Sequence, residues 1–121
     1  KEIQANRLKT AKEFAAAHQV CVVLKGNRTI TAAPDGEIWV NPTGNPGMAT
    51  GGTGDVLTGL TAGLLAAFHS YPVTRVVAGS VYLHGLAGDL AARETGQNAL
   101  IAGDLLRMIH KAFGTLSERT H

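Results

Sequence analysis

A glycine-rich segment, residues 41–59, contains the residue types and spacing in this chain that could do chemistry: NPTGNPGMATGGTGDVLTG. Its glycines let the backbone adopt positive φ angles and approach a ligand closely. The segment leads into a predicted helix, whose first turn supplies N–H groups without intrahelical partners and the positive end of the helix dipole. Together these features predict a site for a phosphate or for another anion that develops during a reaction.

Asp55 ends the glycine run and is the candidate catalytic residue. A carboxylate at a helix start would repel a bound phosphate, but it can take a proton from a hydroxyl group that attacks that phosphate. The alternative is an ordinary first-turn acid that complements the helix dipole. Neither standard phosphate motif is present. The chain has no Gly-Lys-Ser/Thr, and Leu57 stands where a G-x-G-x-x-G motif beginning at Gly52 needs its third glycine.

A second candidate site, Lys25 and Gly26, follows a short apolar run at residues 20–24. The run is continuous and β-branched, which predicts a strand buried on both faces. A lysine at the end of such a strand lies where open α/β sheets bind ligands. The alternative is a strand-to-hairpin turn that needs Gly26 and leaves Lys25 in solvent.

The elements that must position these candidates alternate between helical and strand patterns. Apolar residues on one face predict a helix over residues 3–17. Two strand-like runs, residues 28–32 and 37–40, flank the turn sequence PDG and predict a β-hairpin directly before the glycine loop. Part of the sheet is therefore expected to be antiparallel, within one layered α/β domain.

Three further helices are predicted after the glycine loop. Residues 55–68 are small or apolar nearly all round, which predicts a buried helix. Residues 73–96 predict a long helix closed by a final glycine. Residues 103–114 predict a last helix, with Asp104 as its N-cap and Gly114 as its C-cap.

Composition and charge exclude several classes of protein. The chain has 121 residues, 45% hydrophobic and 17% charged, which predicts one globular domain or a piece of one. A formal net charge of +2, no run of Lys or Arg and few aromatic residues argue against nucleic-acid binding. The single Cys21 is expected to be a buried, inert thiol. No apolar segment reaches the roughly 18 residues of a membrane span, so we expect a cytoplasmic protein without signal peptide or membrane contact.

Several polar and aromatic residues are expected to have structural roles. His84 and Asp89 lie five positions apart on a predicted helix, which is not a spacing for two ligands on one face. Trp39 is expected to pack on its neighbour in the hairpin, with stacking on a base as the alternative. The turn sequence Asn45-Pro46-Gly47 is expected to aim the glycine loop. The remaining histidines show no metal-ligand spacing for zinc: His18, His69, His110 and His121.

The run NPGMATGGTGDVLTG resembles the signature of the nucleotide-dependent NAD(P)H-hydrate dehydratases. The likeness continues in VVLKGNRTITAAPDGEIWVNPTGNPG, LHGLAGDLAA and NALIAGDLL, so it covers residues 20–106. It implies the α/β fold class, as a ribokinase-like three-layer α/β/α sandwich with a β-hairpin before the glycine loop. Enzymes of that family are roughly twice as long, with glycine-rich and TPHPGE-like N-terminal segments that do not occur here. Residues 1–121 are therefore expected to be the C-terminal part of such a domain, with one sheet edge unpaired.

The resemblance also implies a reaction. A nucleotide, ADP or ATP, would donate a phosphoryl group to the hydroxyl of hydrated NADH or NADPH, and elimination of phosphate would then restore the double bond. Asp55 would match the family's acid, which contacts the hydrate and serves as the base. Mg²⁺ would be held mainly by phosphates and water, and no protein ligand is expected for it.

Two sets of residues match the family's binding segments. The anion hole would consist of Gly52, Thr53 and Gly54, with Gly54 also touching the nucleotide. The nucleotide-binding stretch would be Lys25, Gly26, Asn27, Arg28 and Thr29.

Two alternatives stay open. The same fold serves small-molecule kinases for vitamin precursors or sugars, which leave a stable phosphorylated product. From a different class, the chain would be a non-catalytic nucleotide-binding or assembly module. Whichever hypothesis holds, the expected protein partner is the missing N-terminal half or further copies of the chain in a homo-oligomer.

Overall fold

The computed structural model describes residues 2–49, 51–96, 102–104, 107–109 and 111–112. Its elements along the chain are α1 (Glu2–His18), β1 (Val22–Leu24), β2 (Ile30–Ala32), β3 (Ile38–Val40), a 3₁₀ turn (Pro46–Met48), α2 (Thr53–Ala67) and α3 (Val73–Thr95). These confirm the predicted order of helix, strand, hairpin and two helices, with each strand one or two residues shorter than the pattern suggested.

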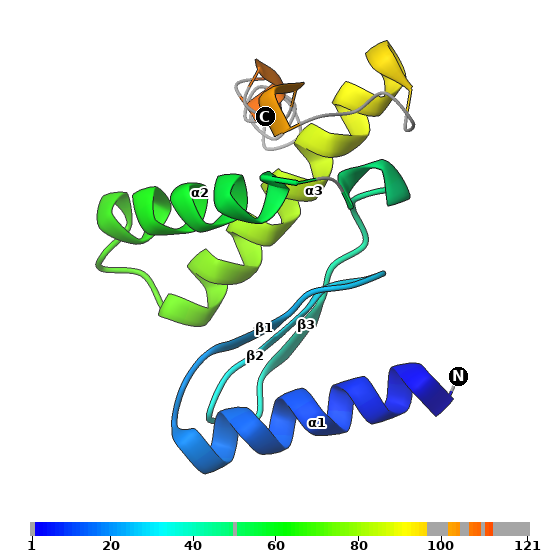
Figure 1. Cartoon of the computed structure of the whole chain (residues 1–121). Coiled ribbons are helices and arrows are strands. Elements are labelled where there is room, and N and C mark those ends of the chain that lie inside the picture. The colour runs from blue at the N-terminus through cyan, green and yellow to red at the C-terminus, as the bar shows by residue number, and fades with distance from the viewer. Residues whose placement is uncertain (1, 50, 97–101, 105–106, 110, 113–121) are drawn as a thin grey trace.

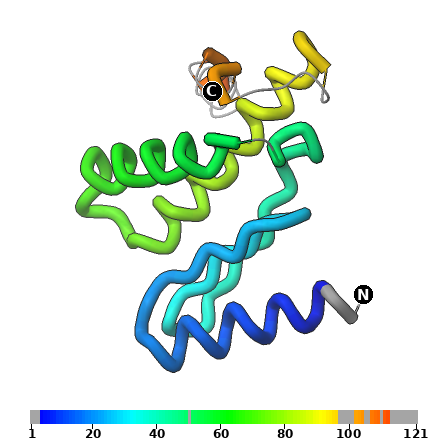
Figure 2. The backbone as a smooth tube through the Cα atoms, in the orientation of Figure 1, coloured from blue at the N-terminus to red at the C-terminus, as the bar shows by residue number. Residues whose placement is uncertain are grey.

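The elements form three layers (Figure 1). The middle layer is a three-stranded antiparallel sheet in the order β1-β2-β3. Helix α1 packs against β1 and β2 on one face, while α3 lies against the other face and is crossed by α2. The tube in Figure 2 shows the chain passing from α1 through the three strands and then into the layer of α2 and α3.

The hairpin between β2 and β3 forms as its turn sequence predicts. Gly36 has a φ of +98°, a conformation that other residues rarely adopt. Its N–H donates to the Ala33 carbonyl over 3.1 Å, and the Ala33 N–H donates to the Glu37 carbonyl over 2.8 Å. The Asp35 carboxylate also accepts the Glu37 N–H over 2.9 Å, which is the side-chain turn typical of this residue. The hairpin therefore delivers the chain from β3 directly to the glycine loop.

Two hydrophobic clusters hold the layers together. The first lies between α1 and the sheet and consists of Ala11, Ala15, Ile30 and Ala32. The second joins α3 to the residues after it and consists of Leu83, Leu86, Ala87, Ala91, Met108 and Ala112. Because many of these side chains are alanines, the helices can approach the neighbouring elements closely.

Strand β1 differs from its sequence prediction. The run at residues 20–24 is not buried on both faces: β1 is half-buried along its length, and Val20 just before it is 42% exposed. The physical reason is that β1 pairs with β2 on one side only, within the part of the chain that the structure describes. Cys21 is likewise half-buried rather than fully buried, and its partial burial raises the pKa of its thiol.

Helix α2 also differs from its prediction as a buried helix. Only Thr53 and Leu57 are buried in it. Among the described elements, α2 packs along α3 with one face, so its opposite face, which includes Gly59 and Gly63, is exposed. Small apolar residues around a helix indicated tolerance of burial, but the neighbours in this chain cover one side only.

The last predicted helix is described in part. Residues 102–104, 107–109 and 111–112 are helical. Asp104 is not the N-cap, because the two residues before it are already helical; its carboxylate instead pairs with Arg107 one turn later. Gly114 lies outside the described residues. In those that are described, we find no helix with the length and apolar character that crossing a membrane requires.

Candidate functional site

A pocket of about 670 Å³ lies between the sheet and the helical layer. It brings together the loop after β1, the segment that follows β3, the start of α2 and the middle of α3. Its lining residues are 25–29, 41–46, 48, 49, 53, 54, 57, 81, 84 and 85. All five residues of the predicted nucleotide-binding stretch thus share one pocket with Thr53 and Gly54 of the predicted anion hole.

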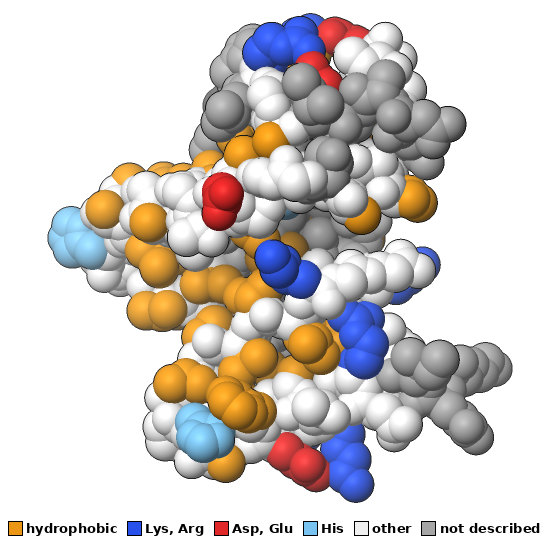
Figure 3. All heavy atoms as spheres, viewed as in Figure 1, with side chains coloured by type: hydrophobic (Ala, Val, Ile, Leu, Met, Phe, Trp, Pro, Cys, Tyr) orange, Lys and Arg blue, Asp and Glu red, His pale blue; other side chains and the backbone are white. Residues whose placement is uncertain are grey.

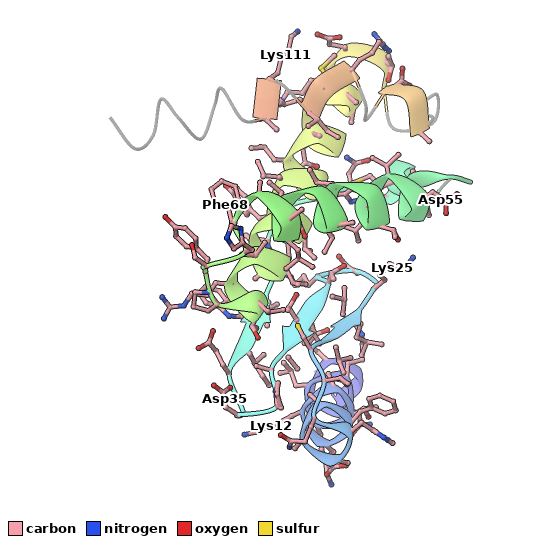
Figure 4. All side chains as sticks on the ribbon, turned by 90° about the vertical axis from the view of Figure 1, so that its left-hand side faces the viewer. Lys12, Lys25, Asp35, Asp55, Phe68 and Lys111 are labelled. Atoms are coloured by element: carbon pink, nitrogen blue, oxygen red, sulfur yellow. The ribbon has the colours of Figure 1, made fainter. Side chains whose placement is uncertain are left out.

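Lys25 and Gly54 form the closest link between the two predicted segments. A β-carbon on Gly54 would lie 2.8 Å from Lys25 Nζ, a distance that real β-carbons do not tolerate. The absence of a side chain at position 54 therefore allows the ammonium group to reach the first turn of α2. Figure 4 shows Lys25 and Asp55 extending toward the same side of the molecule. The lysine charge and the helix dipole both favour an anion there.

The start of α2 depends on glycine at one position. Gly52 is the N-cap residue, with φ +88° and ψ −12°, and provides no side chain to cap the helix. The first hydrogen bond of the helix runs from the Val56 N–H to the Gly52 carbonyl over 3.2 Å. The N–H groups of Gly54 and Asp55 therefore have no intrahelical acceptor, as at any helix start. Such groups are suited to hold an anionic oxygen.

Thr53 fixes this first turn to the rest of the molecule. Its hydroxyl donates to the Met48 carbonyl over 2.7 Å. Its carbonyl lies 2.8 Å from His84 Nε2 and, because a carbonyl only accepts, Nε2 must carry the proton. The glycine loop and α3 are thus both tied to the anion-hole turn.

The surroundings of His84 disfavour its charged form. Partial burial lowers the pKa of its imidazole, and the positive charge of Lys25 lowers it further, while the hydrogen bond to Thr53 opposes these effects. Its hydrogen bond to the Thr53 carbonyl agrees with the expected structural role, and it also lines the pocket. The sequence did not predict its hydrogen-bond partner, because Thr53 lies 31 residues earlier in the chain.

Asp89 holds the other end of the glycine loop. Its two carboxylate oxygens accept the Gly44 N–H and the Asn45 Nδ2, each over 3.0 Å. Asn45 in turn accepts the Gly47 N–H through Oδ1 over 3.0 Å and so caps the 3₁₀ turn. The predicted aiming turn is confirmed. Sequence reasoning missed that Asp89 anchors it across 45 positions.

The loop also packs closely on α3. A β-carbon at Gly85 would collide with Thr43, and one at Gly88 would collide with Met48. Thr43 donates its hydroxyl to the Tyr82 carbonyl over 2.9 Å. Gly85 and Gly88, one turn apart on α3, therefore allow the loop after β3 to pack directly against the helix.

Not every predicted site residue lines the pocket. Asp55 is exposed and lies next to Gly54 on the first turn of α2, but it does not line the pocket. Gly52 is exposed as well and shapes the turn through its backbone. Trp39 lies outside this pocket: it lines a second pocket of about 250 Å³ between β3 and α3, where its Nε1 donates to Glu37 over 2.8 Å. No group of three or more His, Cys, Asp or Glu suited to a metal ion occurs among the described residues.

This arrangement defines the class of protein: a layered α/β domain whose glycine-rich helix start opens into a pocket shared with a lysine loop. A family model described as NAD(P)H-hydrate dehydratase matches residues 1–111. The chain therefore belongs to the NAD(P)H-hydrate dehydratase family, as the resemblance of its glycine segment predicted.

Curated relatives of the chain are longer than it is. It is 50% identical over 117 residues to a bifunctional NAD(P)H-hydrate repair enzyme, Nnr, of Moorella thermoacetica, covering 97% of this chain and 22% of the relative. It is 45% identical over 115 residues to an ADP-dependent (S)-NAD(P)H-hydrate dehydratase of Bacillus subtilis, covering 93% of this chain and 41% of the relative. The chain thus spans between about a fifth and two fifths of these proteins.

Solved structures confirm the fold. An ADP/ATP-dependent NAD(P)H-hydrate dehydratase from Bacillus subtilis, co-crystallised with ATP and Mg²⁺, superposes with a TM-score of 0.87 at 41% identity over 94% of this chain and 40% of that one. A ribokinase-like superfamily protein from Enterococcus faecalis superposes with a TM-score of 0.73 at 37% identity over 88% and 36%. The predicted ribokinase-like α/β fold is confirmed, over 40% and 36% of the length of these two structures.

Proposed function

We propose that this chain carries the nucleotide site and the catalytic acid of an enzyme that dehydrates hydrated NADH and NADPH with ADP or ATP. The observation that carries the proposal is the shared pocket, in which Lys25 Nζ reaches the α2 start at Gly54. Family membership adds the substrate class, and the ADP and ATP dependence printed for relatives adds the donor.

The proposed roles combine the family resemblance with the shared pocket. The loop of Lys25, Gly26, Asn27, Arg28 and Thr29 binds the nucleotide, and the turn of Gly52, Thr53 and Gly54 stabilises the negative charge of the transferring phosphoryl group. Asp55, exposed beside Gly54, takes the proton from the hydrate's hydroxyl as that oxygen bonds to phosphorus and the remainder of the nucleotide leaves. Loss of phosphate from carbon and of a proton from the ring then restores the double bond.

Mg²⁺ would supply charge neutralisation between the phosphates. The residues present suit a cation held by phosphates and water, because the carboxylate nearest the α2 start, that of Asp55, is a single exposed group. Asp89, the other carboxylate near the loop, is occupied by two N–H donors.

The test is an assay with chemically prepared NADH hydrate, Mg²⁺ and either ADP or ATP, on this chain and on the complete enzyme. The complete enzyme should release NADH, followed by its absorbance, and inorganic phosphate in equal amounts. A stable phosphorylated product without NADH would instead make the protein a kinase. Calorimetric binding of ADP or ATP without turnover in the short chain would show that it holds the donor site and lacks part of the substrate site.

A further inference from the structure

The proposed nucleotide loop, residues 25–29, is held on its α1 side by the side chain of Arg7. Arg7 lies on α1, and its guanidinium reaches both sides of the loop. Nη2 donates to the carbonyls of Leu24 over 3.2 Å and Lys25 over 3.4 Å, before the turn. Nη1 donates to the carbonyls of Asn27 over 2.9 Å and Arg28 over 3.5 Å, after it. One planar group therefore joins the incoming and outgoing backbone.

The loop backbone needs such support. Gly26 has a φ of +152°, and a β-carbon there would lie 2.8 Å from Arg7 Nη2. Arg28 has a φ of +62°, in the left-handed region that non-glycine residues rarely adopt. Strained backbone of this kind persists when surrounding contacts determine it. Gln4 Oε1 accepts from Arg7 Nη1 over 3.0 Å and so orients the guanidinium.

The contacts of Arg7 also determine which way the loop's N–H groups point. A trans peptide is planar, so its N–H points opposite to its carbonyl, and the described chain has no cis peptide. The carbonyls of Leu24, Lys25 and Asn27 face Arg7 on the α1 side of the sheet. The N–H groups of the same peptides therefore point away from α1. The pocket is lined by residues of α2 and α3, and these helices lie on the side of the sheet away from α1 (Figure 1).

We propose that Arg7 is a positioning residue for nucleotide binding: from the far face of the sheet it aligns three peptides of the loop so that the N–H groups of Lys25, Gly26 and Arg28 face the nucleotide's phosphates. This inference rests on the proposed function, because it assigns the nucleotide to that pocket. Lysine cannot replace arginine here, since an ammonium group is a single point and cannot bridge both sides of the loop as the five-donor fork does.

The first experiment measures ADP binding by calorimetry in the 121-residue chain for Arg7→Gln, Arg7→Lys and Lys9→Gln. Arg7→Gln should weaken ADP binding at least roughly tenfold, because several oriented hydrogen bonds are lost. Arg7→Lys should weaken it almost as much. Lys9→Gln is the matched control: it removes a positive charge from the same helix, at a 75% exposed side chain whose ion pair is with Glu13 over 3.9 Å. It should bind ADP as the unchanged chain does.

The second measurement, amide hydrogen exchange without nucleotide, tests the clamp independently of the ligand. Exchange at residues 25–29 should rise in both Arg7 variants and stay constant in Lys9→Gln, while exchange in α3 stays constant in all three. In the complete enzyme, Arg7→Lys should raise KM for the nucleotide and leave KM for the hydrate unchanged, a split that general destabilisation would not produce.

Unchanged ADP affinity and unchanged loop exchange in Arg7→Gln would overturn the proposal. If the unchanged chain and the complete enzyme both fail to bind ADP and ATP, the proposed function is wrong and the nucleotide role of Arg7 falls with it. Tight ADP binding with no effect of either Arg7 variant would overturn the role of Arg7 alone. The two failures are therefore distinguishable.

Discussion

At the scale of single residues, the site depends on the absence of a side chain at Gly54. Gly54→Val should weaken ADP binding, because its β-carbon would lie 2.8 Å from Lys25 Nζ and the flexible ammonium group would have to move away from the α2 start. Gly59→Val is the matched control on the same helix: a β-carbon there meets nothing within 4 Å. Calorimetry on both variants decides the matter. Equal affinities would show that Lys25 and Gly54 do not share a phosphate.

Asp55 is the residue on which the proposed chemistry depends. In the complete enzyme, Asp55→Asn should lower turnover by roughly 10²- to 10⁴-fold, the usual contribution of a general base. Nucleotide affinity should change little, since the side chain is exposed and does not line the pocket. Glu13→Gln, at a 67% exposed carboxylate on α1, is the control for loss of a charge. Turnover of Asp55→Asn near that of the unchanged enzyme would remove Asp55 from the mechanism and leave it as a helix-dipole acid.

At the scale of elements, α3 is the scaffold that carries the loop and the start of α2. Asp89 anchors the loop at Gly44 and Asn45, and His84 anchors the first turn of α2 at Thr53. The spacing of His84 and Asp89 does not suit two ligands on one helix face. The two residues instead hold the two ends of the glycine loop. The site is consequently as rigid as the packing of α2 and the loop on α3.

This attachment should make the stability of the fold depend on pH. The native pKa of His84 is lowered, so the native state binds fewer protons than the unfolded chain as the pH falls through the ordinary histidine value near 6.5. The stability that His84 contributes is complete above that value and is lost as the pH falls toward the lowered native pKa. Urea unfolding at pH 7.5 and 5.5 should therefore show lower stability at pH 5.5.

Variants at two histidines isolate this effect. His84→Gln keeps a nitrogen donor for the Thr53 carbonyl but cannot titrate, so it should lose less stability between pH 7.5 and 5.5 than the unchanged chain does. His69→Gln, at an exposed histidine beyond the end of α2, should lose as much as the unchanged chain. An identical loss in His84→Gln would assign the pH dependence to other groups.

Comparison with the sequence shows that features set by neighbouring residues could be predicted from it. The hairpin turn, the glycine helix start and the aiming turn each depend on residues within a few positions, and all three formed as predicted. Arg7, His84 and Asp89 were missed as anchors, because their partners lie 17 to 45 positions away. Periodicity and turn chemistry carry no information about such pairs. The outer surfaces of β1 and α2 were mispredicted for a related reason: composition indicates what an element tolerates on each face, whereas burial depends on which neighbours are present.

At the scale of the whole molecule, both outer strands of the described sheet are continuous apolar runs. β3 carries Trp39, whose indole is hydrogen-bonded to Glu37. β1 also has the continuous apolar sequence of an inner strand, and nothing described pairs with its outer side. Figure 3 shows hydrophobic side chains gathered on the face that carries β1, between α2 and α1. The chain spans only 41% of its Bacillus subtilis relative, so we propose that the rest of the complete protein, or a second copy of the chain, covers this edge.

The unaccompanied chain should therefore associate through β1. Light scattering should give a mass above the 12.6 kDa of one chain, rising with protein concentration. Val20→Lys should shift the chain toward the monomer, because a charge beside an open strand opposes pairing. Val40→Lys is the matched control, since Val40 is also 42% exposed but lies on β3. If Val40→Lys dissociates the chain and Val20→Lys does not, the interface is at β3, and a monomer at every concentration would show that the β1 edge needs no cover.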